Sequence, residues 1–157
     1  MAEDLTADEI LQVAVEIEET GRVFYEAMGA ASLNEKIDEL CRRLALAEKE
    51  HYERFRAMRA HLVRHAERAL TGGEKEFIHG MVAHRIMPSL REALAAVHQS
   101  SPAHLLDLAG ALEQDSITFY SRLHPIIAPD DATALELILE EEKRHLQELK
   151  LARRHLV

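Results

Sequence analysis

Six side chains have the types and the spacing needed to hold a pair of metal ions. Two segments contain a glutamate followed three residues later by a histidine, and two other segments contribute one glutamate each. The six residues are Glu18, Glu48, His51, Glu113, Glu142 and His145. A glutamate and a histidine three residues apart lie on one face of a helix. A bundle that receives one glutamate from each of two helices, and a Glu-x-x-His pair from each of two others, forms a di-iron or di-manganese carboxylate site.

The ligand types also restrict the metal. Four carboxylates balance the charge of two divalent cations, and oxygen and imidazole ligands suit iron and manganese better than copper. These ligand types therefore indicate two iron ions or two manganese ions as the cofactor, with zinc possible in their place. The single cysteine, Cys41, excludes an internal disulfide and any cysteine-rich metal site, and we interpret it as a small core residue.

The two halves of the chain repeat this pattern. Glu18 begins the segment EETGRVFY, and 95 residues later Glu113 begins the segment EQDSITFY. Glu48 begins EKEH, and 94 residues later Glu142 begins EKRH. An internal duplication of a helix hairpin would produce both offsets at once. The duplication matters because a single Glu-x-x-His pair is weak evidence in a glutamate-rich chain.

Some glutamates fit the pattern poorly or not at all. Glu76 and His79 form a third Glu-x-x-His pair without a matching helix, and we interpret them as surface residues. The six candidates could also be ordinary surface residues. Apolar residues surround Glu18 and Glu113, however, and a charged glutamate left unpaired in a core costs several kcal/mol. Four neighbouring glutamates are instead assigned to a solvated face: Glu19, Glu50, Glu140 and Glu141.

The elements that must position these residues are helices. Apolar residues recur at three- and four-residue steps, which predicts a first helix over about 7–30. A second helix opens at a capping box from Ser32 to Glu35 and extends to about residue 69, where Thr71, Gly72 and Gly73 end it. The later long helices are predicted over about 102–123 and from a cap at Pro129–Asp131 to about 154.

The connections decide the topology. The first and second long helices, and the third and fourth, are joined by short segments, which makes each pair an antiparallel hairpin. Between the pairs lies a long crossover with a helical stretch from about residue 75 that is interrupted at Pro88. We therefore predict an all-α fold, a ferritin-like four-helix bundle made of two duplicated hairpins, as one domain over residues 1–157.

Composition excludes several classes of function. Acidic residues outnumber Lys and Arg by 28 to 19, so the formal charge is −9 and nucleic acid is not an expected partner. No run of 18 apolar residues is present, and the N-terminal segment is acidic, so neither a membrane span nor a signal peptide is expected. We expect the protein in the cytoplasm.

The full pattern resembles the rubrerythrin family of the ferritin-like superfamily, in particular its rubredoxin-less branch, in which Phe-Tyr follows the first and third ligand glutamates. The resemblance covers about residues 8–153. It implies that Glu18 and Glu113 are terminal ligands, that Glu48 and Glu142 bridge the metals, and that each histidine binds one iron. Tyr25 and Tyr120 are then candidate catalytic residues beside the metals.

Two departures from the family pattern have consequences. The chain lacks the four cysteines of a rubredoxin domain, so an external donor protein, rubredoxin-like or similar, would have to supply electrons. Ser116 stands where those enzymes place an additional ligand glutamate, which makes the site closer to a symmetric six-ligand cluster.

Three functions follow as hypotheses. The first is a non-haem di-iron oxidoreductase that reduces hydrogen peroxide or dioxygen. The second is a ferroxidase or iron-handling protein that oxidises ferrous iron for storage or delivery, and the third is a metal-free helical interaction module. We also expect a homodimer, in which the long crossover would allow the hairpins to exchange between subunits.

Overall fold

The computed structural model describes residues 6–62, 71–83 and 90–156. Four long helices account for most of them: α1 (Ala7–Ala31), α2 (Glu35–Leu62), α5 (Pro102–Tyr120) and α6 (Ala132–His155). The shorter elements are α3 (Gly72–Ala83), α4 (Leu90–Gln99) and the 3₁₀ turn η1 (Pro129–Asp131). The described residues contain no strand, as the sequence predicts for an all-α fold.

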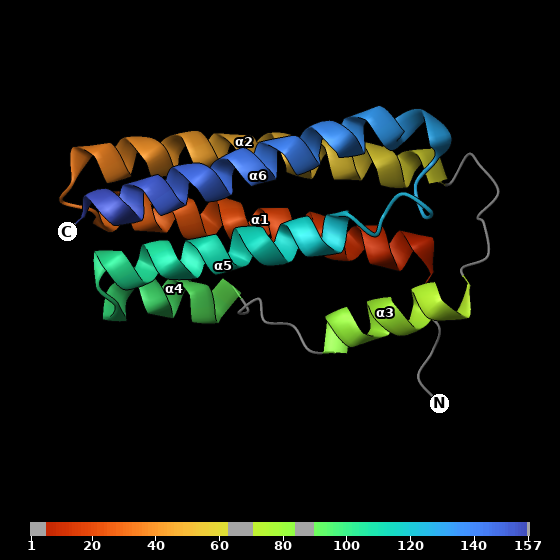
Figure 1. Ribbon diagram of the computed structural model, residues 1–157, viewed down its shortest axis with the longest axis horizontal. Helices are drawn as coiled ribbons and strands as arrows, with labels where there is room; N and C mark the ends of the chain where they lie inside the picture. Colours follow the sequence, from red (N-terminus) through yellow and green to blue (C-terminus); the bar gives the residue numbers. More distant parts are fainter. Residues whose placement is uncertain (1–5, 63–70, 84–89, 157) are drawn as a thin grey trace.

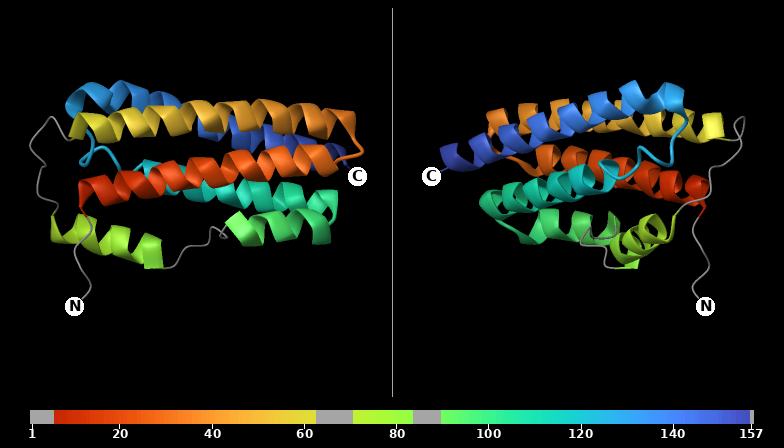
Figure 2. Two further views of the ribbon diagram at one scale, coloured as in Figure 1. Left: turned by 180° about the vertical axis from the view of Figure 1, so that it is seen from behind. Right: turned by 45° about the vertical axis from the view of Figure 1, so that its right-hand side comes forward.

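The four long helices lie side by side along the length of the molecule (Figure 1). α1 packs closely on α2, and α5 on α6, while α1 also contacts α5 and α2 contacts α6. The crossover helices α3 and α4 run along one side of this bundle, and α4 contacts α1 (Figure 2). The predicted arrangement of two hairpins and a partly helical crossover is therefore confirmed.

The N-terminal cap of α1 has the predicted form, and that of α2 does not. At α1 the predicted capping box is present, since the backbone N–H of Glu9 donates to Oγ1 of Thr6 at 3.2 Å and the N–H of Thr6 donates to Glu9 at 2.7 Å. At α2 the predicted box from Ser32 to Glu35 is wrong. Oδ1 of Asn34 accepts from the N–H groups of Lys36 and Ile37 instead, because asparagine is an equally good cap and stands directly before the first residue of the helix.

Two further boundaries differ from the prediction. Thr71 and Gly72 open a helix: Oγ1 of Thr71 accepts from the N–H of Glu74 at 3.3 Å, and α3 begins at Gly72 rather than at about residue 75. The described part of α2 ends at Leu62, so the predicted extension to 69 lies outside the described residues, as does Pro88. α5 ends at Tyr120, three residues before its predicted end, where a turn begins.

The start of α6 uses Asp131 in an unexpected way. Its carboxylate was predicted to cap the helix, but it makes no capping hydrogen bond. It instead lies 2.8 Å from Nδ1 of His61 on α2, so a contact between hairpins replaces a local one. At the other end of α6, Arg153 and Arg154 lie in the last turn, where positive charge is favourable.

The apolar core has two parts. One cluster includes Leu11, Phe55, Tyr120 and Ile138, and the other includes Phe24, Leu44, Leu106 and Leu149. On each of the four long helices, the residues of the two clusters are separated by the positions of the six candidate ligands. Apolar packing therefore closes the bundle on both sides of the candidate site. Cys41 is buried in the second cluster, as predicted.

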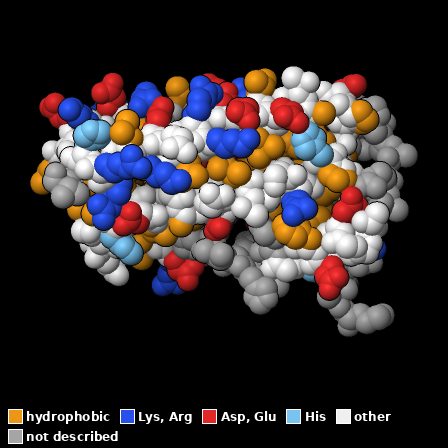
Figure 3. Space-filling model, in the orientation of Figure 1, with side chains coloured by type: hydrophobic (Ala, Val, Ile, Leu, Met, Phe, Trp, Pro, Cys, Tyr) orange, Lys and Arg blue, Asp and Glu red, His pale blue; other side chains and the backbone are white. Residues whose placement is uncertain are grey.

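The surface is mixed in character. Acidic, basic and hydrophobic side chains are interspersed on the face that carries α5 and α6 (Figure 3). Within the described ranges, no helix is long and apolar enough to cross a membrane.

Candidate metal centre

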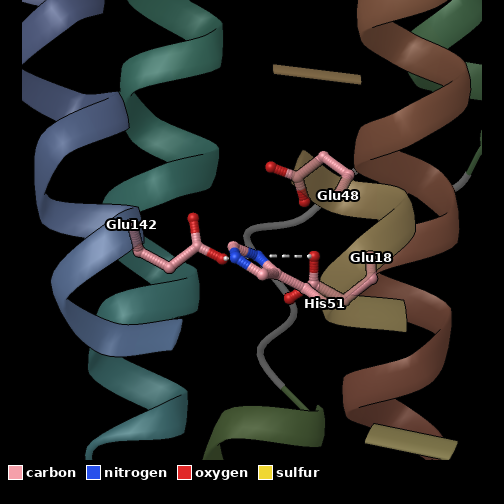
Figure 4. A group of neighbouring side chains, drawn as sticks. All are labelled: Glu18, Glu48, His51 and Glu142. Atoms are coloured by element: carbon pink, nitrogen blue, oxygen red, sulfur yellow. Dashed lines mark hydrogen bonds and ion pairs between the residues drawn. The ribbon is translucent and has the colours of Figure 1, made fainter. Parts of the chain in front are cut away.

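The structure brings all six predicted ligands together at the middle of the bundle. The six residues form two overlapping groups of four side chains. Within each group, the ligand atoms all lie within 4.8 Å of one another. The first group is Glu18, Glu48, His51 and Glu142, and the second is Glu48, Glu113, Glu142 and His145. Figure 4 shows the first group, whose side chains point toward one another from α1, α2 and α6. Two adjacent positions for a cation result.

Glu48 and Glu142 belong to both groups, whereas the other four residues belong to one group each. A carboxylate that reaches two adjacent cation positions can bridge them with its two oxygens. This sharing agrees with the bridging and terminal roles that the family resemblance implies. That these side chains bind metal stays a prediction.

The helices position these side chains through simple geometry. Glu48 and His51 are one turn apart on α2, and Glu142 and His145 are one turn apart on α6, so each pair points into the bundle from one face. Facing helices then supply Glu18 from α1 and Glu113 from α5. Within this chain, the four long helices supply all six side chains.

Several buried carboxylate oxygens of the cluster lack a hydrogen-bond donor and would be satisfied by a metal ion. Both carboxylate oxygens of Glu18, and Oε1 of Glu48, are buried without a hydrogen-bond partner among the described residues. Their nearest cationic groups are histidine rings, with Nδ1 of His51 3.5 Å from Glu18 and Nδ1 of His145 3.7 Å from Glu48. A buried carboxylate with free oxygens costs several kcal/mol unless a cation or a proton compensates it. Two divalent ions would satisfy these oxygens and neutralise four carboxylates, so the residues fit a dinuclear centre.

Without metal, protons must compensate part of this charge. Burial raises the pKa of Glu48 well above its ordinary value, and the nearby carboxylates of Glu18 and Glu142 raise it further. Burial and the charge of Glu142 have the same effect on the pKa of Glu113. Burial and like charge therefore favour the protonated forms of both carboxyl groups, and a metal ion would displace these protons.

The charge of the other two groups is set by hydrogen bonds. Burial alone would lower the pKa of His51, but hydrogen bonding to Glu142 and the nearby charge of Glu18 raise it to about 11. Burial alone would raise the pKa of Glu142, but hydrogen bonds from Glu113, His145 and His51 lower it far below its ordinary value. In the metal-free protein His51 is thus a cation beside the carboxylate of Glu142.

The two predicted tyrosines flank the cluster from opposite ends. The hydroxyl group of Tyr25 donates a hydrogen bond to Oε1 of Glu113. Tyr120 is fully buried, and its hydroxyl oxygen has no hydrogen-bond partner among the described residues. Burial raises the pKa of both tyrosines, and the nearest carboxylates, Glu113 and Glu18, raise it further. Both phenols therefore stay protonated and face the site as neutral groups.

Glu141 is the residue that sequence reasoning missed. It was assigned to the solvated face with Glu50 and Glu140, which are indeed exposed. Its carboxylate instead lies 2.7 Å from Nε2 of His51 and accepts a hydrogen bond from Arg54 at 2.9 Å. The only signal was its place directly before Glu142. A contact between two helices cannot be found from spacing along one of them.

The remaining sequence candidates stay outside the cluster. Glu76 is exposed, and neither it nor His79 belongs to a group of ligand atoms in the described ranges. Ser116 is buried on α5, and its hydroxyl group donates to the carbonyl oxygen of Leu112 at 3.1 Å. The hydroxyl hydrogen of Ser116 is therefore engaged by the backbone of α5 and is not directed at the cluster.

Comparisons with known proteins agree with the fold and identify the family. A family model described as Rubrerythrin matches residues 9–153. The chain is similar to a crystal structure from Thermotoga maritima that is described as a ferritin-like diiron-carboxylate protein. The two are 25% identical with a TM-score of 0.74, and the comparison covers 100% of each chain. No curated protein sequence matches this one.

Proposed function

Because the chain belongs to the rubrerythrin family, we propose that it is a non-haem di-iron oxidoreductase that reduces hydrogen peroxide or dioxygen. The observation that carries this proposal is the pair of four-residue groups that share Glu48 and Glu142. An iron pair bound there would supply two electrons and Lewis acidity to the substrate oxygen atoms. Reduction of one peroxide to two waters consumes two electrons and two protons.

The residues of the chain have separate tasks in this proposal. Glu48 and Glu142 hold the two ions at adjacent positions, while the other four ligands bind one ion each. Tyr25 donates its hydroxyl proton to Glu113 in a hydrogen bond and so fixes the orientation of that carboxylate. The apolar clusters at both ends exclude water from the bundle axis, which strengthens the electrostatic interactions inside it.

Ser116 supports a second candidate, a ferroxidase that oxidises ferrous iron for storage or delivery. The additional carboxylate of the peroxide-reducing relatives is replaced by a hydroxyl group that bonds within α5. A six-ligand cluster without this carboxylate resembles the sites at which ferrous iron is itself the substrate. The two candidates differ in whether the oxidised iron stays in the site.

The partners follow from the oxidoreductase proposal. Four glutamates and two histidines offer no store of electrons beyond the metal pair, so repeated turnover needs an external electron donor. We propose a donor protein that is rubredoxin-like or similar. We also propose a homodimer, and exchange of hairpins within it remains a hypothesis that size and structure measurements on the dimer would test.

One experiment tests the function directly. Protein loaded anaerobically with two ferrous ions is mixed with one equivalent of hydrogen peroxide or with dioxygen, and the product iron is followed by absorbance and gel filtration. The oxidoreductase proposal expects the iron to stay bound after oxidation and to return to the ferrous form with a chemical reductant. Release of ferric iron, or its growth into a larger mineral, would favour the ferroxidase.

A further inference from the structure

The two candidate metal positions differ in what supports their histidines. His51 turns Nδ1 toward the cluster, 3.0 Å from Oε1 of Glu142, and its Nε2 lies 2.7 Å from Oε2 of Glu141. A carboxylate at Nε2 fixes the orientation of the ring and keeps a proton on Nε2. The proton that binding displaces is then the one on Nδ1, and the Nδ1 lone pair that remains faces the metal ion. His51 is thus arranged in advance as a ligand.

Glu141 is itself held in place. Nη1 of Arg54 on α2 donates to the same oxygen of Glu141 at 2.9 Å, and Nη2 of Arg144 lies 3.8 Å from the other oxygen. The side chain of Glu141 is 24% exposed, whereas that of Glu140 is 66% exposed and pairs with Lys143 on the surface. The carboxylate behind His51 is therefore a fixed group that bridges α2 and α6.

His145 has no equivalent support among the described residues. Its Nδ1 faces the cluster, 3.3 Å from Glu142 and 3.7 Å from Glu48, but Nε2 makes no hydrogen bond in the described part of the chain. The side chain of His145 is 11% exposed, while that of His51 is 0% exposed. One histidine is therefore fixed and enclosed, and the other is held from one side only.

The internal repeat explains this difference. The offset of 94 residues that relates His51 to His145 relates Glu141 to Ala47, which lies on α2 one residue before Glu48. The position that supplies the carboxylate in one half of the chain supplies a methyl group in the other. The six ligands therefore follow the internal repeat, whereas the supporting carboxylate of Glu141 occurs in one half of the chain only.

We propose that Glu141 makes the two metal positions unequal, so that the position formed by Glu18, Glu48, His51 and Glu142 binds a divalent ion more tightly and fills first. The inference rests on the proposed function only in requiring that the six ligands bind two ions. Glu141 is a positioning residue that acts through His51. Loss of such a supporting group typically weakens metal affinity about 10- to 100-fold, which sets the expected difference.

Titration with Mn²⁺ alone tests this proposal on the unaltered protein. Calorimetry gives the two dissociation constants, and crystals grown with one equivalent of Mn²⁺ give the occupancy of each position from anomalous scattering. We expect the ion mainly at the His51 position. Equal occupancy with two ions bound would overturn this inference and leave the proposed function intact. Binding of fewer than two ions would overturn both.

Matched variants separate support of the ring from net charge. Glu141→Ala should weaken the tighter position about tenfold or more, and Glu141→Gln, whose amide oxygen still accepts from Nε2, should restore part of the loss. Glu140→Ala removes the same charge one residue away and should leave both constants unchanged. An equal effect of Glu140→Ala, or an equal loss at both positions in Glu141→Ala, would overturn the proposal.

A variant with the opposite effect guards against misfolding as an explanation. Ala47→Glu places a carboxylate at the position equivalent to Glu141, on a residue that is half-buried rather than in the core. It should tighten the His145 position and narrow the difference between the two constants. A wider difference in a variant that melts normally would contradict the role assigned to position 141.

Discussion

Gly21 on α1 lies directly against Glu48 on α2. A β-carbon built on Gly21 would stand 3.0 Å from Oε2 and 3.3 Å from Cδ of the Glu48 carboxylate. The missing side chain therefore leaves room for the carboxylate that is shared by both groups of ligand atoms. The repeat places Ser116 at the equivalent position of α5, which is also a small residue.

This contact predicts a metal-specific effect of Gly21→Ala. Alanine favours the helix by about 1 kcal/mol over glycine, and in the metal-free protein the end of the Glu48 side chain can move aside. A carboxylate that is bound to metal cannot move, so the crowding persists in the loaded protein. We expect an unchanged or higher melting temperature without metal and a smaller increase on addition of Mn²⁺.

Gly110→Ala provides the control for this variant. Gly110 lies within α5, and a β-carbon there would make only an ordinary contact of 3.7 Å with Leu146. Gly110→Ala should raise the melting temperature of the metal-free protein through helix stabilisation. Its further increase on addition of Mn²⁺ should equal that of the unaltered protein. A full increase in Gly21→Ala as well would mean that Glu48 does not need the space beside Gly21.

The bridging glutamates should matter more than the terminal ligands. Glu48→Ala or Glu142→Ala should remove both ions, because each of these residues reaches both positions. His145→Ala should mainly weaken one ion. Metal analysis after dialysis at micromolar free Mn²⁺ measures the stoichiometry, with Glu50→Ala as a control on an exposed glutamate of the same helix. Retention of two ions at undiminished affinity by Glu48→Ala would refute the bridging role.

The metal-free protein should lose stability as the pH rises. The folded state raises the pKa of Glu48, Glu113 and His51, so it binds more protons than the unfolded chain above the ordinary values of these groups. Stability from such groups is complete below the unfolded pKa and declines as the pH rises toward the folded one. The lowered pKa of Glu142 contributes stability that is already complete above about pH 5.

Thermal melts between about pH 5 and about pH 8 should therefore show a falling melting temperature without metal. Metal affinity should change in the opposite direction, because binding releases the protons of Glu48 and Glu113. The increase in melting temperature on addition of Mn²⁺ should thus grow with pH. The amide of Glu113→Gln has no proton to lose, so the melting temperature of this metal-free variant should fall less with pH. An unchanged dependence on pH would contradict the raised pKa of Glu113.

Ser116 offers a test of substrate preference. If an additional carboxylate promotes reduction of peroxide, Ser116→Glu should raise the rate at which peroxide oxidises the di-ferrous protein relative to dioxygen. Ser116 is buried, so the larger side chain should also lower the melting temperature by overpacking. Stopped-flow absorbance and a thermal melt measure both effects. A lower melting temperature without a faster peroxide reaction would assign Ser116 to packing and favour the ferroxidase.

The fold could be predicted because its determinants are local and repeated. Apolar periodicity and short connections are sufficient to define two hairpins, and the capping box at Thr6 has the predicted form. Boundaries were less certain where two residues compete for one role. Asn34 caps α2 in place of Ser32, and Asp131 contacts His61 instead of capping α6. The second of these depends on tertiary contact, which a local pattern does not contain.

The site was predictable to the same extent. The six ligands repeat along the chain, and each occupies the inner face of its helix, so their convergence follows from the fold. The contact of Glu141 with His51 does not follow, because it joins residues 90 positions apart on two helices and breaks the repeat. The unequal support of His51 and His145 could be found only from the structure.

The central claim is that one chain holds two iron ions between Glu48 and Glu142 and that this pair reacts with an oxidant. Anaerobic titration with ferrous iron, followed by Mössbauer spectroscopy before and after one equivalent of hydrogen peroxide, tests it most directly. We predict two ferrous ions per chain that convert together to a coupled diferric pair. A single bound ion, or two ions whose oxidised spectra show no coupling, would contradict the claim.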